Sequence, residues 1–240
     1  MTVKKRIASV DILRGMTILA MILVNTPGDW SQVYAPLLHA EWHGLTPTDL
    51  IFPFFLFIVG ISIYFAYKNK PPSWNTYKKI FVRSLKLIFL GLFLNLFLPY
   101  FPFIVDFETA RIPGVLQRIG VVFFVSSILY LSFNWKTLIL FSVFILIGYW
   151  LFLGFVPLPD GTLPTFDRAP NNWAMYVDLN ILGEHMWKDD YDPEGLMSSL
   201  PAIATCISGI LIGRLLTSNK SKLVKNLIII SIVLLVMGYV

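Results

Sequence analysis

Long apolar runs separated by short polar segments make up most of this chain. Each run is about 20 residues long, which is the length an α-helix needs to cross a hydrocarbon core of about 30 Å. Inside hydrocarbon every backbone N–H and C=O needs an internal partner, and a helix provides one. The pattern therefore predicts an all-α, polytopic transmembrane helix bundle with about seven spans. We place these spans at residues 11–26, 48–67, 80–98, 113–133, 137–156, 196–216 and 223–240.

The composition fits a membrane protein and excludes an ordinary soluble domain. Hydrophobic residues make up 56% of the 240 residues and charged residues 14%, against about 25% charged in a typical soluble domain. The mean hydropathy is +0.71. The one cysteine, Cys206, lies inside a predicted span. The sequence therefore contains neither a disulfide framework nor a cysteine metal cluster.

The segments between the predicted spans alternate in charge. One set contains no acidic residue and carries the bases Lys4, Lys5, Arg6, Lys68, Lys70, Lys78, Lys79, Lys136, Lys220 and Lys222. The other set, residues 27–47, 99–112 and 157–195, carries twelve acidic residues and only three bases. The positive-inside rule makes the first set cytoplasmic and places the N-terminus in the cytoplasm. The net charge of +5 is then a topology signal, with contacts to membrane lipid, and does not indicate nucleic-acid binding.

The two ends of the chain carry further expectations. The first apolar run contains Asp11 and Arg14 and lacks a small-residue cleavage site, so we expect it to stay as the first helix and not to be cleaved as a signal peptide. The last run stops at its 18th residue with no polar flank. We therefore expect residues 1–240 to form a single transmembrane domain that is incomplete at its C-terminus.

The loop between the first two predicted spans concentrates the residues that carry chemistry. His39 and His43 are four apart, a spacing at which two side chains share a helical face and ligate zinc. Ala40, however, stands where the zinc-protease signature needs Glu, and His185 is a distant third ligand, so we predict no metal site. A histidine beside a carboxylate, here Asp49 or Glu41, instead suits a general base or a nucleophile.

Three long motifs occur in order along the chain. They are LRG…VN…G…LLHAEWHGLTPTDLIFPFFLFIVGIS, then RIPGVLQRIG at residues 111–120, and YDPEGLMSSLPAI at residues 191–203. Together they resemble the family of transmembrane acyltransferases that includes heparan-α-glucosaminide N-acetyltransferase. The resemblance implies transfer of an acetyl group from cytosolic acetyl-CoA to the amine of a terminal glucosamine on the far side of the membrane.

The resemblance also assigns roles to two residues, and this chain differs from the family pattern in two respects. The active histidine of the family motif HAxWNGLT falls on His39, and an asparagine that closes the first helix falls on Asn25. The animal motif has Asn where this chain has His43. A bacterial-type member in an inner membrane would not meet heparan, so the resemblance does not imply the same acceptor sugar. Family members have about eleven spans, more than the seven predicted here, which again indicates an incomplete C-terminus.

The predicted topology brings the candidate catalytic residues His39, Asn25 and Asp49 to the outer membrane face. Asn25 would donate a hydrogen bond to the thioester oxygen of acetyl-CoA as negative charge develops there. His39 would either accept the acetyl group as an acyl-imidazole or act as general base on the sugar amine. Since the donor is cytosolic, its pantetheine arm would have to pass up between the helices.

Charged residues inside spans are costly and mark candidate binding sites. We assign Arg14, Arg83, Lys86 and Arg118 to acetyl-CoA, with an ion pair to Asp11 as the structural alternative for Arg14. Positive-inside flanking is the alternative for Arg83 and Lys86.

For the acceptor aminosugar or glycan we predict contacts from Trp42, His43, Asp192 and Glu194, because aromatic rings stack on sugars and carboxylates pair with ammonium groups. An interfacial tryptophan and an ordinary packed loop are the structural alternatives. Gly209 and Gly213 form a GxxxG pattern, which predicts close helix packing within the bundle or between the protomers of a homodimer.

Two other classes of function compete with an enzyme. A secondary transporter or carrier of a sugar-type substrate would also need charges inside the membrane and broken helices. The two halves of the chain show no inverted repeat, however, and the HAEWHGLT loop lies at the membrane boundary and not at its midplane. A membrane scaffold would leave the clustered Asn, His and Asp without a role.

Overall fold

The computed structural model describes residues 7–97, 101, 103–217, 225, 227–229, 231 and 232. Within these residues the chain is all-helical, which confirms the predicted fold class. Its α-helices are α1 (Ala8–Asn25), α2 (Ile51–Tyr67), α3 (Trp74–Leu96), α4 (Val115–Ser132), α5 (Trp135–Phe155), α6 (Trp173–Leu182) and α7 (Ser199–Leu215). Three short 3₁₀ helices, η1 (Trp30–Gln32), η2 (Ala35–Leu37) and η3 (Thr48–Leu50), precede α2.

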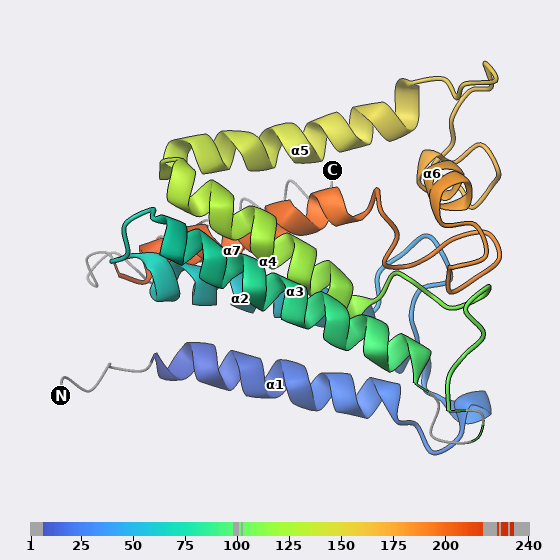
Figure 1. The fold of residues 1–240 in the computed structure, drawn as a ribbon, viewed down its shortest axis with the longest axis horizontal. Coiled ribbons are helices and arrows are strands. Elements are labelled where there is room, and N and C mark those ends of the chain that lie inside the picture. The colour runs from blue at the N-terminus through green and yellow to red at the C-terminus, as the bar shows by residue number, and fades with distance from the viewer. Residues whose placement is uncertain are drawn as a thin grey trace.

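The six long helices run side by side, and successive ones reverse direction (Figure 1). One end of the bundle, here called the basic end, carries the start of α1 and the α2–α3 connection with its lysines (Figure 1). The opposite end, here called the acidic end, carries loop 26–47, the α3–α4 connection and loop 156–198, which includes α6 (Figure 1). The sequence-predicted charge alternation therefore corresponds to two physical ends of the molecule.

The helices agree with the first six predicted spans to within a few residues. In the part of the chain that the structure describes, four segments are long and apolar enough to cross a membrane: Ala8–Asn25, Thr48–Tyr67, Val115–Ser132 and Trp135–Phe155. Helix α3 is longer, at 23 residues, but carries four bases, and α7 is a shorter apolar helix. The predicted span 223–240 falls largely outside the described residues. Helix α6, in the loop that precedes α7, was not predicted.

Local sequence signals explain where several helices begin. The side chain of Ser73 accepts a hydrogen bond from the Thr76 N–H at the start of α3. Asn134 and Asn172 do the same for two N–H groups each at the starts of α5 and α6. These contacts satisfy N–H groups that the first turn of a helix leaves without a partner.

The centre of the bundle is a close contact between α2 and α7. A Cβ atom placed on Gly60 would lie 1.9 Å from the carbonyl oxygen of Cys206, and one on Gly209 would lie 2.0 Å from that of Phe57. Only glycine permits this approach of two backbones. Gly213 similarly faces Tyr64 of α2. The GxxxG pattern of Gly209 and Gly213 thus packs within the bundle.

Helices α1 and α5 expose most of their apolar surface. Leu19 and Ile22 on α1, and Leu140 and Phe144 on α5, are each more than half exposed. Lipid chains solvate such surfaces, so these side chains fit an integral membrane protein.

Candidate active site

His39 and Asp49 form a hydrogen-bonded pair at the acidic end. The distance from Nδ1 of His39 to Oδ1 of Asp49 is 2.6 Å. Because a carboxylate only accepts hydrogen bonds, Nδ1 of His39 is the donor, and the neutral imidazole then has its lone pair on Nε2. The His39 side chain is 70% exposed and that of Asp49 is 23% exposed. The bond to Asp49 therefore fixes the tautomer of His39 and leaves its basic nitrogen, Nε2, accessible.

Asp49 also holds the surrounding loop in place. Its other oxygen, Oδ2, accepts hydrogen bonds from the backbone N–H of Thr46 (2.9 Å) and of Ala40 (3.3 Å). The Thr46 hydroxyl lies 3.0 Å from the same oxygen. Asp49 itself belongs to η3, which leads directly into α2. The carboxylate therefore ties the histidine to the end of a membrane-embedded helix.

Asn25, the third predicted catalytic residue, is the last residue of α1 and is exposed. Its side chain makes no hydrogen bond to His39, Asp49 or any other described residue. It follows Arg14 by eleven positions, about three helical turns, so both residues lie on nearly the same face of α1. The structure thus joins His39 to Asp49 and leaves Asn25 on a neighbouring helix end.

Trp42 and His43 connect the His39 loop to loop 156–198. Trp42 donates from Nε1 to the carbonyl oxygen of Phe166 (2.8 Å), and its ring meets that of Tyr191 edge-on at 5.2 Å. His43 lies with Nε2 2.7 Å from Oδ1 of Asp167. Both residues were predicted to contact the acceptor, and both make protein contacts in the structure.

Asp192 and Glu194, also predicted to bind the acceptor, pair with Arg111. The guanidinium donates from Nε (2.8 Å) and Nη2 (2.6 Å) to the two oxygens of Asp192 and from Nη2 to Glu194. The Asp192 side chain has no exposed surface, and it also accepts the N–H groups of Trp187 and Glu194. An acceptor amine would reach Asp192 only if the ion pair opened.

The electrostatics of this group keep Arg111 cationic. Burial disfavours the charged guanidinium, but the hydrogen bonds and charges of Asp192 and Glu194 outweigh it and raise the pKa of Arg111. The guanidinium also lies over the ring of Trp187, 5.0 Å from its centroid. The first residue of RIPGVLQRIG is therefore locked to the YDPEG motif 81 to 83 residues away.

Arg118 lies one turn into α4 from the acidic end and is buried. Its Nη2 donates to the carbonyl oxygen of Gly195 (3.0 Å) and to the Ser198 hydroxyl. Its Nε is buried and has no hydrogen-bond partner among the described residues. Arg118, predicted to bind acetyl-CoA, therefore contacts loop 156–198.

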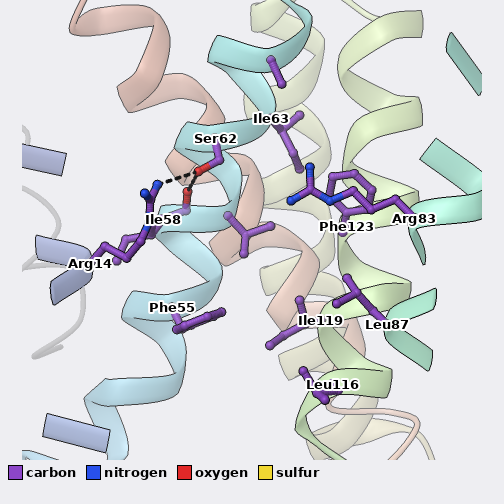
Figure 2. Close-up of a pocket in the computed structure, with 12 residues that line it drawn as sticks. Arg14, Phe55, Ile58, Ser62, Ile63, Arg83, Leu87, Leu116, Ile119 and Phe123 are labelled. Atoms are coloured by element: carbon purple, nitrogen blue, oxygen red, sulfur yellow. Dashed lines mark hydrogen bonds between the residues drawn. The ribbon is translucent and has the colours of Figure 1, made fainter. Parts of the chain in front are cut away.

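A cavity of about 420 Å³ lies between α1, α2, α3 and α4 (Figure 2). Apolar side chains of Phe55, Ile58, Val59, Ile63, Ala66, Leu87, Leu116, Ile119 and Phe123 line it, together with Arg14, Ser62 and Arg83. From Phe55 to Ala66 it follows α2 over about 16 Å, at 1.5 Å per residue. The cavity thus extends along the helix from the basic half toward the acidic end.

Two arginines lie on opposite sides of this cavity (Figure 2). Arg14 reaches from α1 and donates to the Ser62 hydroxyl on α2 (3.3 Å) and to Asp11 (3.2 Å). Arg83 reaches in from α3, with its guanidinium 4.9 Å from the ring centroid of Phe123. Lys86, three residues later, is exposed and does not line the cavity. The structure thus brings two of the four predicted acetyl-CoA residues to one space.

Comparison of the whole sequence with known families and proteins confirms the resemblance seen in the three motifs. The model of the family described as "Heparan-alpha-glucosaminide N-acetyltransferase, catalytic" matches residues 6–238. The chain belongs to this family. Curated relatives named heparan-alpha-glucosaminide N-acetyltransferase are 30% identical in human and 29% identical in mouse. Each alignment covers 90% of this chain, and 39% of the human and 40% of the mouse protein. The chain therefore spans about two fifths of the length of these relatives.

Membership in this family covers all three motifs. Among the described residues no group of three or more His, Cys, Asp or Glu side chains could hold a metal ion.

Three residues of this candidate site were missed from sequence. Ser62 orients Arg14, Asp167 binds His43, and Asp178 lies buried behind the YDPEG motif. Ser62 carries a signal, since it is a polar residue within an apolar span. Asp167 and Asp178 carry none, because the contacts that matter here, to His43 and to Leu196, join residues more than 15 positions apart in sequence.

Proposed function

We propose that this chain forms part of a membrane enzyme that moves an acetyl group from cytosolic acetyl-CoA to the amine of an extracytoplasmic aminosugar of the glucosamine type, with His39 at the reacting centre. The observation that carries the proposal is the His39–Asp49 pair at 2.6 Å. Asp49 fixes the tautomer and stabilises the imidazolium that forms when Nε2 takes a proton. Family membership and the cavity between α1 and α4 support the same activity.

Two routes use the same nitrogen. In the first, Nε2 of His39 attacks the thioester carbon, the C–S bond breaks, and the sulfur leaves as the thiolate of coenzyme A. The amine then attacks the acyl-imidazole, loses a proton and releases the histidine. In the second, Nε2 takes the proton from the amine while the amine attacks the thioester directly, and the C–S bond breaks to release the thiolate of coenzyme A. Asp49 supports both routes, because each one places positive charge on the ring.

The donor would occupy the cavity from the basic end. Arg14 and Arg83 provide cations for its phosphates, and the apolar lining suits the less polar arm that carries the thioester. Phe55, at the far end of the lining, follows Asp49 by six residues, about 9 Å along α2. A thioester at that end of the cavity would approach the His39–Asp49 pair.

Asn25 is proposed as the group that stabilises the oxyanion. It shares a face of α1 with Arg14, and Arg14 lines the cavity. One preorganised donor of this kind is worth about 3–4 kcal/mol of barrier. Its amide would act once the thioester oxygen lies within about 3 Å of it.

The acceptor would approach the exposed side of His39. Trp42 and His43 border the imidazole along the chain, and loop 156–198 encloses them from the other side. We propose that Asp192 and Glu194 serve the acceptor through the loop that they fix by pairing with Arg111.

Sealed membrane vesicles from cells that make the protein test the proposal. Labelled acetyl-CoA is supplied on the cytoplasmic face and glucosamine-type acceptors on the other. We expect labelled N-acetyl product with the wild type, and loss of at least about 100-fold with His39→Ala, as for removal of a catalytic base. Equal labelling by wild type and His39→Ala would refute the role of His39. Movement of unmodified aminosugar across the membrane without acetylation would indicate the transporter.

A further inference from the structure

The loop that carries His39 is held by contacts on both sides of this residue. Before His39, the hydroxyls of Thr46 and Thr48 donate to the carbonyl oxygens of Leu38 (2.8 Å) and Pro36 (3.3 Å). Asp49 fixes it at the His39 side through Ala40 and Thr46. Trp42 and His43 fix its other side through Phe166 and Asp167. These last two contacts join residues 124 positions apart in the chain. The group of Trp42, His43, Phe166 and Asp167 is here called the loop latch.

The Phe166–Asp167 side of the latch is built on two helices. A Cβ atom on Gly154 of α5 would lie 2.7 Å from Cζ of Phe166, so the phenyl ring lies directly against the helix at a glycine. Asn172, which caps α6, donates from Nδ2 to the carbonyl oxygens of Thr165 (3.1 Å) and Asp167 (3.2 Å). The Thr165 hydroxyl accepts the N–H of Asp167. The segment 165–167 is therefore a fixed support and not a free loop.

The Trp42–His43 side has no comparable support of its own. Residues 39–47 contain no α-helix, and His43 is exposed. Apart from Asp49, the polar contacts that hold residues 40–43 are those to loop 156–198. The position of His39 relative to the bundle is therefore set on one side by Asp49 and by the hydroxyls of Thr46 and Thr48, and on the other side by the latch.

We propose that His43 and Asp167 form a positioning pair that holds the loop so that Nε2 of His39 faces the incoming thioester. This inference rests on the proposed acetyl transfer. A carboxylate only accepts, so Nε2–H of His43 donates to Asp167, and this bond occupies the side chain that would otherwise meet the acceptor. His43 acts through the loop and does not touch the reacting atoms. Asn at this position would have an amide that also donates to a carboxylate.

Displacement of a reacting group by about 1 Å can cost 10²-fold in rate. Loss of the latch should therefore lower kcat by roughly 10-fold to 100-fold, through the position of His39. The KM for acetyl-CoA should change less than about twofold, because Arg14 and Arg83 lie far along the bundle from the latch. The KM for the acceptor should also be little changed.

The vesicle assay with four variants tests the pair. His43→Leu and Asp167→Ala each remove the bond, His43→Asn keeps a donor, and the double variant His43→Leu/Asp167→Ala reports the coupling. Asp160→Asn, an exposed carboxylate of the same loop that bonds only to Thr162, is the matched control. Unfolding temperatures in detergent verify that all variants fold.

We expect a low kcat in both single variants, a kcat near wild type in His43→Asn, and no further loss in the double variant. The proposed pair would be overturned if His43→Leu had the kcat of the wild type. It would also be overturned if the loss of kcat in the double variant equalled the product of the losses in the two single variants. A raised acceptor KM at unchanged kcat would also overturn it and would make His43 an acceptor contact. If His39→Ala retains full activity, the role of His39 fails, and if the wild type gives no acetylated product, the acetyl-transfer proposal fails. Both results differ from those that would overturn the pair.

Discussion

Arg118 and Asp178 bind opposite sides of a single peptide unit. Arg118 of α4 donates to the carbonyl oxygen of Gly195 (3.0 Å), and Asp178 of α6 accepts the N–H of Leu196 (2.9 Å). The peptide between Gly195 and Leu196 thus separates a buried cation from a buried anion. Buried charges are tolerated when hydrogen bonds satisfy them. This arrangement fixes the YDPEG motif where it leads into α7.

Gly195→Ala should destabilise the protein. A Cβ atom at this position would lie 1.8 Å from Oδ2 of Asp178, so either the buried carboxylate or the peptide must move. Overpacking of this kind costs about 1–3 kcal/mol. Thermal unfolding in detergent should show a lower Tm for Gly195→Ala. Gly28→Ala, also at the acidic end but with open space around the Cβ position, should leave Tm unchanged. Equal effects of the two changes would contradict this account.

Asp178→Asn should change how stability depends on pH. Burial raises the pKa of Asp178, although the Leu196 N–H opposes the shift. Because the folded pKa lies above the unfolded value of about 3.9, the folded state binds the proton more tightly, and stability falls as pH rises through the folded pKa. The variant cannot titrate. The Tm of wild type relative to Asp178→Asn should therefore decrease from pH 4 to pH 7. A relative Tm that increases over this range would show that the charge of Arg118 dominates.

The fold was predictable because membrane spans have a simple sequence signal. Runs of about 20 apolar residues fixed the existence and order of the first six helices, and the charges of the loops fixed which loops share an end. Helix α6 was missed because it has no long apolar run and lies within a polar loop. Its signals, the cap at Asn172 and the positive φ of Gly183 at its end, are short and occur in many turns.

The site was predictable only in part. His39 and Asp49 are ten residues apart in one loop, so sequence placed them together. The contacts of Asp192, Glu194 and Arg118 depend on loops more than 70 residues distant, and no local pattern reports such pairings. Their contacts in the structure are with protein groups, and their assignment to ligands stays a prediction.

Arg83→Leu should raise the KM for acetyl-CoA, because the change removes a cation from the cavity. A hydrogen bond to a charged group contributes about 1.5–3 kcal/mol, which corresponds to roughly 10-fold or more in KM. Arg14→Leu should act similarly. Lys86→Leu removes the same charge three residues along α3 but outside the cavity, and should leave KM nearly unchanged. Initial rates against acetyl-CoA concentration in vesicles measure all three. A rise for Lys86→Leu as large as for Arg83→Leu would mean that only the general positive potential matters.

Gly209→Ala should weaken the α2–α7 contact. The added Cβ would lie 2.0 Å from the backbone oxygen of Phe57, which cannot move without shifting α2. We expect a loss of about 2 kcal/mol or more, seen as a lower Tm in detergent. Gly148→Ala on α5 is the matched control, because nothing lies within 4 Å of its Cβ position and alanine favours a helix by about 1 kcal/mol. A stable Gly209→Ala protein would show that the helices separate at little cost.

Asp49→Asn should reduce kcat with little change in stability. The amide oxygen can still accept the N–H groups of Ala40 and Thr46, so the loop keeps its shape. The amide NH₂ then faces Nδ1 of His39 and favours the tautomer with the proton on Nε2, which removes the basic lone pair from the reacting nitrogen. The corresponding change in a Ser-His-Asp triad costs about 10⁴-fold in kcat, and we expect a loss of at least about 100-fold here. The measurements are kcat in vesicles and Tm in detergent. A kcat within threefold of wild type at unchanged Tm would show that Asp49 only supports the loop, and His39 would then need another group to set its tautomer.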